Sequence, residues 1–161
     1  MNIVHLMVGV QGSGKSTFSK KLSEELNIII ASTDEVRKQN VGIKEELVWP
    51  LVYKMCADEL KKGKDVIFDA TSITPKVRNR LIDNIKFHFD SFEVGCYYFK
   101  VDPKVCKNRV ALRNKIEGEI FIPLEVIDSY HERLIEPTID EGFSFVNIVD
   151  EFGNIIEQKN K

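Results

Sequence analysis

Cysteine is scarce in this sequence, and the few cysteines form no pattern. Cys56, Cys96 and Cys106 are widely spaced and odd in number, which argues against a disulfide framework. No CxxC pair and no cluster of cysteine with histidine suggests a metal site built from these residues. These absences are typical of a reducing compartment, and the cytoplasm is the expected location.

Long apolar runs and an excess of positive charge are also missing. No window approaches 18 uncharged apolar residues, and the N-terminus lacks the features of a secretory signal, so no membrane association is expected. The formal net charge is −2 at pH 7, and the isoelectric point is about 6.0. Proteins that wrap long nucleic acid need a basic face. The overall charge disfavours that class but leaves open a local basic groove for the end of a strand.

What the sequence does contain is an alternation of strand-like and helix-like segments. With no repeat, linker or low-complexity tract, we expect one domain over residues 1–161. Strands are predicted at 3–10, 27–33, 65–71, 92–101 and 143–149, and helices at 16–26, 34–40, 45–62, 75–87, 103–114 and 123–135. This order predicts a three-layer α/β fold, in which helices cover both faces of a five-stranded parallel sheet. Ligands of such sheets bind at the carboxyl ends of the strands.

The residues after the first predicted strand read GVQGSGKS (9–16) and match the phosphate-loop pattern G-x-x-x-x-G-K-[ST] in full. Backbone N–H groups and the helix start would bind phosphate oxygens. Lys15 would reach the β- and γ-phosphates, and Ser16 would ligate Mg²⁺. The strand before and the helix after disfavour the alternative, a glycine-rich turn without a ligand. The predicted nucleotide-binding residues in this segment are Gly12, Ser13, Gly14, Lys15, Ser16 and Thr17.

An acid and a base follow the second predicted strand. Asp34 leaves the strand at the ligand-bearing edge, and Arg37 lies one helical turn further on, so both side chains can face the same site. A carboxylate there can take the proton of an attacking hydroxyl, and an arginine can bind a phosphate or carboxylate through two hydrogen bonds. The alternative is a helix cap and a surface charge.

Asp69 and Thr71 follow the third predicted strand, which can lie next to the first in a sheet of this type. Asp69 could then sit beside Ser16 and reach Mg²⁺ through water, or it could fix the acceptor together with Thr71. An aspartate that merely caps the turn is the alternative. The sequence does not separate the metal role from the acceptor role.

A basic segment at residues 106–122 is predicted to form a helical lid. Arg109 and Arg113 are four residues apart and project from one helix face. Arginines that close over a phosphoryl-transfer site neutralise the charge that builds on the phosphates. The loop with Gly118 would let the segment open and close. The alternative is a solvated basic face.

Four segments together resemble the P-loop polynucleotide 5′-hydroxyl kinase family, both phage-type and bacterial: GVQGSGKST, STDEVR, VIFDATSITPKVRNRLI and CKNRVALRN followed by IPLEVI. The resemblance implies transfer of the γ-phosphate of ATP to a hydroxyl, with Asp34 as general base and Arg37 on a phosphate of the acceptor. It also implies Arg113 over the donor phosphates and Asp69 in the active-site tunnel. Two positions depart from the family, because Ser72 replaces an asparagine and the lid motif lacks its asparagine.

Three functions are therefore compatible with the sequence. The first is an ATP- and Mg²⁺-dependent kinase of the 5′-hydroxyl end of DNA or RNA. The second is a kinase of a small metabolite or nucleoside with the same phosphate machinery, which the acidic isoelectric point favours. The third is an ATP-binding switch that hydrolyses ATP without an acceptor. The identity of the acceptor and the oligomeric state are not visible in the sequence.

Overall fold

The computed structural model describes residues 1–161 and contains six strands, six α-helices and one short 3₁₀ helix. The strands are β1 Ile3–Val8, β2 Ile30–Ser32, β3 Val66–Asp69, β4 Glu93–Phe99, β5 Phe145–Val149 and β6 Ile155–Asn160. The helices are α1 Lys15–Leu26, α2 Thr33–Gln39, α3 Glu45–Lys61, α4 Pro75–His88, α5 Pro103–Arg113, α6 Leu124–Arg133 and the 3₁₀ helix η1 Ile139–Glu141. No helix combines the length and the apolar character needed to cross a bilayer.

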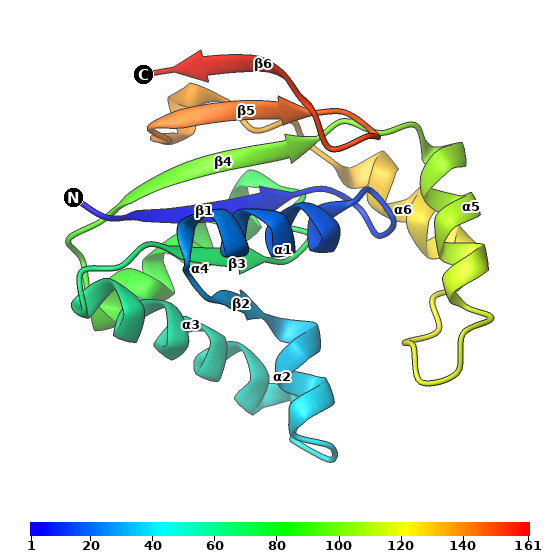
Figure 1. The fold of residues 1–161 in the computed structure, drawn as a ribbon, viewed down its shortest axis with the longest axis horizontal. Coiled ribbons are helices and arrows are strands. Elements are labelled where there is room, and N and C mark those ends of the chain that lie inside the picture. Colours follow the sequence, from blue (N-terminus) through cyan, green and yellow to red (C-terminus); the bar gives the residue numbers. More distant parts are fainter.

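All six strands form one sheet in the order β2-β3-β1-β4-β5-β6. The first five in this order are parallel, as expected, and β3 does lie next to β1. The expected number of strands was wrong, because β6 adds an antiparallel edge to β5. Figure 1 shows β1, β4 and β5 pointing to the side on which α5 lies, with β6 running the opposite way. The carboxyl ends of the parallel strands therefore meet on that side.

The core lies on both faces of this sheet, as the three-layer prediction requires. On one face, α3 and α4 pack around Val4, Leu6 and Val8 of β1. On the other face, α1 and α5 pack around Met7 and Ile67. These five side chains are almost fully buried, and burial of each such side chain stabilises the fold by about 1.5–3 kcal/mol. The alternation along β1 thus fixes which helices cover which face.

Side-chain caps set the starts of the helices that follow the strands. Ser32 accepts a hydrogen bond from the backbone N–H of Glu35 and so starts α2 directly at the end of β2. Thr74 caps α4 and Asp102 caps α5, and each is followed by a proline at the first helical position. The cap of α2 stands directly at the end of β2, whereas short connections separate β3 from α4 and β4 from α5.

A buried arginine connects three segments behind this edge. The guanidinium of Arg78 on α4 is fully buried. It donates to both carboxylate oxygens of Glu141, at 2.9 and 3.0 Å. It also donates to the carbonyl oxygens of Ser72 and Ile135, at 2.8 and 3.0 Å. Arg78 therefore holds the segment that follows β3, and each nitrogen of its guanidinium group has a hydrogen-bond partner.

Candidate active site

The phosphate loop joins β1 to α1, in the strand–loop–helix arrangement that the sequence predicts. Gly12 and Gly14 have φ values of +79° and +101°, which L side chains rarely adopt. Gly14 starts α1 without any side-chain cap, so the first N–H groups of the helix remain available to an anion. Gln11 Oε1 and Ser13 Oγ are buried and have no hydrogen-bond partner. The Ser13 hydroxyl can donate to a phosphate oxygen, which fits a polyphosphate bound in a loop of this shape.

Lys15 lies at the centre of a group of charges. Its ammonium group donates to the carbonyl oxygen of Val10, at 3.0 Å. Burial lowers the pKa of Lys15, the nearby charges of Asp69 and Asp34 oppose that change, and the charge of Arg113 adds to it. The structure therefore brings together four residues that the sequence places in four different segments. This is the arrangement expected of a phosphoryl-transfer site.

Ser16 and Asp69 face each other because β3 is the neighbour of β1 in the sheet. Ser16 Oγ donates a hydrogen bond to Asp69 Oδ2 at 3.2 Å. Burial raises the pKa of Asp69, whereas the charge of Lys15 and the hydrogen bond from Ser16 act in the opposite direction. A hydroxyl and a carboxylate are hard oxygen ligands of the kind that suit Mg²⁺, which usually completes its shell with water and substrate phosphates. No cluster of three or more His, Cys, Asp or Glu side chains could hold a metal ion independently.

Thr71 and Thr17, the two other predicted residues near the loop, lie as follows. Thr71 contributes its backbone, because its carbonyl oxygen accepts a hydrogen bond from Gly9 N–H at 3.0 Å. Thr17 is exposed on the first turn of α1. The hydrogen bond between Gly9 and Thr71 connects the segment that follows β3 in the sequence to the start of the phosphate loop. A backbone contact of this kind leaves no signal in the residue type.

Asp34 and Arg37 on α2 form an ion pair at 2.9 Å, as their spacing allows. Only Oδ1 of Asp34 is used in this pair, so Oδ2 has no hydrogen bond. Arg37 is also bound by Glu45, the first residue of α3, which accepts from both Nε and Nη2. The hydrogen bond to Glu45 raises the pKa of Arg37 and lowers the pKa of Glu45. Sequence reasoning missed Glu45, although it is an acid in the first turn of the next helix.

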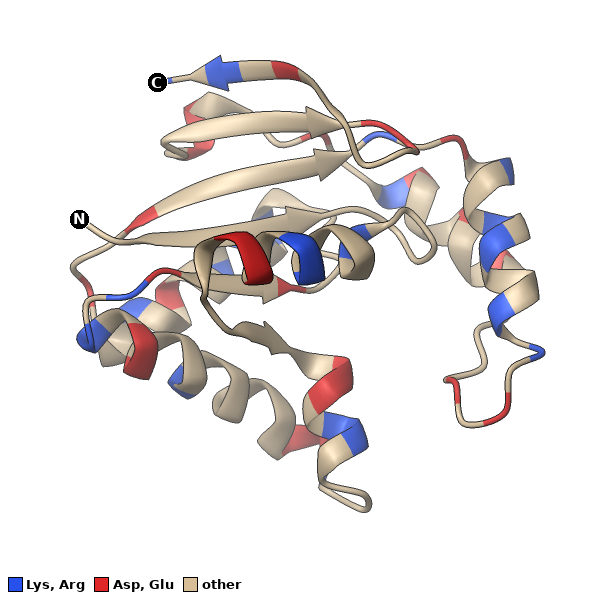
Figure 2. Ribbon diagram, viewed as in Figure 1, with Lys and Arg blue, Asp and Glu red and all other residues tan.

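The predicted lid consists of α5 followed by an irregular loop, so only its first part is helical. Figure 2 shows basic residues along α5. Arg109 donates to the carbonyl oxygen of Gly12 at 3.2 Å and to the carbonyl oxygen of Glu151. It therefore fastens α5 to the phosphate loop and to the turn between β5 and β6. The side chain of Arg113 makes no hydrogen bond or ion pair within the chain, so it is free to meet a ligand.

The base of α5 is packed against the phosphate loop. A Cβ atom added to Gly12 would lie only 2.6 Å from the backbone oxygen of Cys106. Further along, Asn114 closes the loop after α5, because its side-chain amide donates to the Ile122 carbonyl oxygen at 2.7 Å and accepts from the Ile122 N–H at 2.9 Å. Lys38 of α2 and Glu119 of this loop approach to 3.9 Å. Asn114 and Ile122 therefore hold the two ends of this loop together, and Glu119 between them approaches α2.

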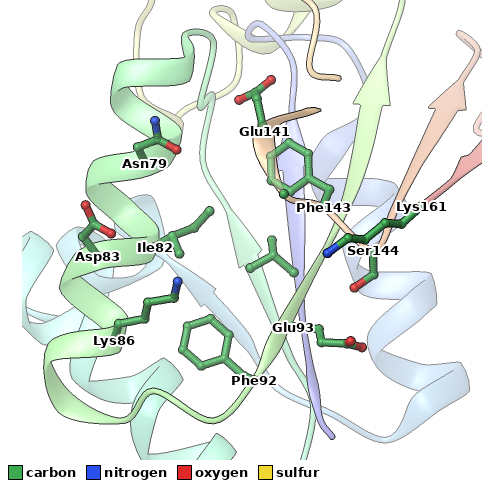
Figure 3. A pocket seen from close by; sticks show the side chains of 12 residues that line it. Asn79, Ile82, Asp83, Lys86, Phe92, Glu93, Glu141, Phe143, Ser144 and Lys161 are labelled. Atoms are coloured by element: carbon green, nitrogen blue, oxygen red, sulfur yellow. The ribbon is translucent and has the colours of Figure 1, made fainter. Parts of the chain in front are cut away.

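A separate cavity of about 300 Å³ lies between α4 and the first residues of β4. Figure 3 shows Asn79, Asp83 and Lys86 on α4, with Ser144 and Lys161 on the opposite side. No predicted site residue lines this cavity. The phosphate machinery is thus confined to the carboxyl edge of the sheet.

Comparison with known proteins agrees with this geometry. A family model described as an AAA domain matches residues 4–137. The adenylate kinase of Thermosipho melanesiensis is 37% identical over 78 residues, which are 48% of this chain and 33% of that relative. The chain thus matches about a third of the length of this curated relative.

Two solved structures share the fold at low sequence identity. A sugar kinase from Janibacter sp. HTCC2649 superposes with a TM-score of 0.68 at 19% identity, covering 96% of this chain and 87% of that one. A gluconokinase from Sinorhizobium meliloti 1021 superposes with a TM-score of 0.57 at 17% identity, covering 91% and 81%. The architecture is thus that of P-loop kinases.

Proposed function

The chain belongs to the AAA domain family, and from that premise and the geometry of the site we propose that it is a kinase that transfers the γ-phosphate of ATP to a hydroxyl group of a small molecule. The observation that carries this proposal is the geometry of Asp34, which follows β2 at the carboxyl edge of the sheet. Arg37 holds its Oδ1 at 2.9 Å, and its Oδ2 makes no hydrogen bond. The adenylate kinase relative and the fold shared with sugar kinases support a small acceptor.

The proposed reaction uses the residues as follows. The phosphates of ATP lie on the loop, with Lys15 against the β- and γ-phosphates. The acceptor hydroxyl gives its proton to the free Oδ2 of Asp34 while its oxygen bonds to the γ-phosphorus. The bond from the γ-phosphorus to the bridging oxygen breaks, and ADP leaves. Arg113, which has no partner within the chain, neutralises charge on the transferring group.

Ser16 and Asp69 would hold Mg²⁺, directly or through water, and the ion would neutralise phosphate charge. Asp69 could instead orient the acceptor, as the sequence leaves open. Its hydrogen bond to Ser16 supports the metal role, because Ser16 occupies the position that binds Mg²⁺ in phosphate loops.

The 5′-hydroxyl end of a nucleic acid remains the second candidate acceptor. The observation in its favour is the spacing of Asp34 and Arg37 on α2, which matches the resemblance noted above. Against it stands the charge of the chain, because a formal net charge of −2 gives no general attraction for a nucleic acid.

The test is transfer of label from γ-labelled ATP to a set of acceptors: a nucleoside, a hexose, and DNA and RNA oligomers with 5′-hydroxyl ends. Label on the nucleoside or hexose supports the proposal, and label on the oligomers alone moves the function to strand ends. Phosphate release with no labelled acceptor leaves an ATPase. In the Asp34→Asn variant, transfer should fall by about 10²–10⁴-fold, the usual contribution of general base catalysis, while ATP still binds.

A further inference from the structure

The acceptor side consists of Asp34 and Arg37 of α2 with Glu45 of α3. Its ion pair between Arg37 and Glu45 bears on the charge of the acceptor molecule. Arg37 Nε donates to Glu45 Oε2 at 3.1 Å, and Nη2 donates to the other oxygen of the same carboxylate. This is the two-bond geometry with which arginine recognises a phosphate or carboxylate. Glu45 therefore occupies the place that an anionic acceptor group would take.

The remaining nitrogen of the guanidinium is engaged as well. Arg37 Nη1 donates to Asp34 Oδ1 at 2.9 Å, so each of the three nitrogens binds a carboxylate of the chain. Two carboxylates thus face one guanidinium, and the local charge of the three groups is negative. The side chain of Arg37 is only 33% exposed, which leaves little room for a third anion.

The surrounding residues do not restore a positive field. Between residues 34 and 46 the chain has four acids and three bases. Figure 2 shows the acidic start of α3 lying against the basic part of α2. Glu45 lies in the first turn of its helix, where the helix dipole stabilises a negative charge. Lys44, the exposed residue before Glu45, is the one unpaired base of this stretch. Lys15 and Arg113 lie on the donor side and are needed by the phosphates of ATP.

We propose that Glu45 determines the specificity of the acceptor side, and that by binding Arg37 it selects small acceptors that carry no phosphate or carboxylate group. An anionic acceptor would have to displace Glu45 from Arg37. The displaced carboxylate would remain within reach of the site, because the backbone of Glu45 is fixed at the start of α3, although its side chain is 66% exposed and can turn. An uncharged polyol or nucleoside meets neither obstacle, and Asp34, oriented by Arg37, can still take the hydroxyl proton. This inference rests on the proposed kinase function.

The test compares matched acceptors that differ in one anionic group: a nucleoside with its 3′-monophosphate, and a hexose with the corresponding hexonic acid. In the wild-type protein, we expect kcat/KM to be at least tenfold higher for the uncharged member of the preferred pair. In the Glu45→Gln variant, kcat/KM for the anionic member should rise by about tenfold or more, which is the value of one charge-assisted hydrogen bond. The uncharged member should change much less.

Glu46→Gln is the matched control, because Glu46 is the exposed neighbour of Glu45 and makes no hydrogen bond or ion pair. It should leave the discrimination as in the wild type, and circular dichroism should show that both variants are folded. Equal or better labelling of the anionic members by the wild type would overturn the inference, as would unchanged discrimination in Glu45→Gln. Absence of label on every acceptor, oligomers included, would overturn the proposed function and this inference with it.

Discussion

Arg78 and Glu141 form a doubly hydrogen-bonded ion pair beneath the phosphate loop, and no part of the arginine is exposed to solvent. The arginine also binds the carbonyl oxygen of Ser72, next to Thr71, which in turn holds Gly9. The pair thus reaches the loop through a chain of backbone contacts. Its removal should be felt both in stability and at the site.

The first prediction concerns this pair. Glu141→Ala leaves the Arg78 charge buried without its partner, so the free energy of unfolding should fall by about 3–5 kcal/mol. Urea denaturation followed by circular dichroism measures the change. The double variant Arg78→Met, Glu141→Leu removes both charges and should lose less than the single variant does. A loss below about 1 kcal/mol in Glu141→Ala would show that the pair contributes little.

Removal of Lys15 should separate function from folding. In Lys15→Ala, phosphate transfer should be abolished, because Lys15 is the lysine that the phosphate-loop motif places against the β- and γ-phosphates. The protein should be no less stable, since burial already disfavours the charge and lowers the pKa of Lys15. Label transfer and thermal denaturation measure the two effects. Lys20→Ala, an exposed change on the same helix, should keep normal transfer. Normal turnover in Lys15→Ala would exclude the phosphate-loop assignment.

The Asp69 carboxylate should be required for activity, whereas its charge should lower the stability of the fold. Its pKa is raised in the folded protein, mainly by burial. As the pH rises through the window from the ordinary carboxyl pKa to the raised one, the unfolded chain loses this proton first, so stability falls across that window and stays lower at pH 7. Asp69→Asn removes the buried charge and should raise the Tm at pH 7 by a few degrees, the response that about 1 kcal/mol gives in a chain of this length.

The same variant should lose Mg²⁺-dependent transfer, because the carboxylate ligand is gone. Asp83→Asn on α4 changes an exposed carboxylate and should alter neither quantity. The gain in Tm should shrink as the pH is lowered toward the ordinary carboxyl pKa. Asp69 in the folded wild type is then protonated, and it is as uncharged as the asparagine of the variant. A lower Tm in Asp69→Asn at pH 7 would contradict the prediction.

Asn114 should control the motion of the lid loop. Asn114→Ala removes both hydrogen bonds to Ile122, each worth about 0.5–1.5 kcal/mol. Amide hydrogen exchange in residues 115–122 should therefore become faster, while exchange in β1 stays as slow as before. Mass spectrometry of peptides from this region measures the change. Asn108→Ala, an exposed change on α5, is the control. Equal exchange in the two variants would mean that the loop is held elsewhere.

Local patterns predicted most of the fold, because each depends on residues close in sequence. The glycine-rich loop followed from such a pattern, whereas the place of β3 beside β1 was expected from the type of sheet, because the two strands are far apart in sequence. Strand β6 was missed because all of its residues are exposed and show no apolar alternation. A turn signal was present at Gly153-Asn154, just before this strand. An edge strand of this kind is held by backbone pairing, which side-chain chemistry does not report.

The site was predictable in its residue types but not in its pairings. Asp34, Arg37 and Asp69 stand at strand ends, where a parallel sheet places ligand-binding residues. The partner of Arg37 was not predictable, because Glu45 meets it across a turn and begins another helix. Arg109 was expected to bind the nucleotide, and its contacts to the backbone carbonyl oxygens of Gly12 and Glu151 were not predicted. Contacts between elements depend on packing, and sequence spacing gives no measure of it.

The tight contact between Gly12 and Cys106 has a consequence for how this protein could be redesigned. Even a methyl group on Gly12 would push against the backbone of α5. A redesign must therefore keep the phosphate loop and the first turns of α5 together, as the part of the protein that binds the phosphate donor. The α2–α3 junction lies on the acceptor side, where Arg37 meets Glu45. We therefore expect that exchange of this junction alone, with the phosphate loop unchanged, can give a kinase with a new acceptor.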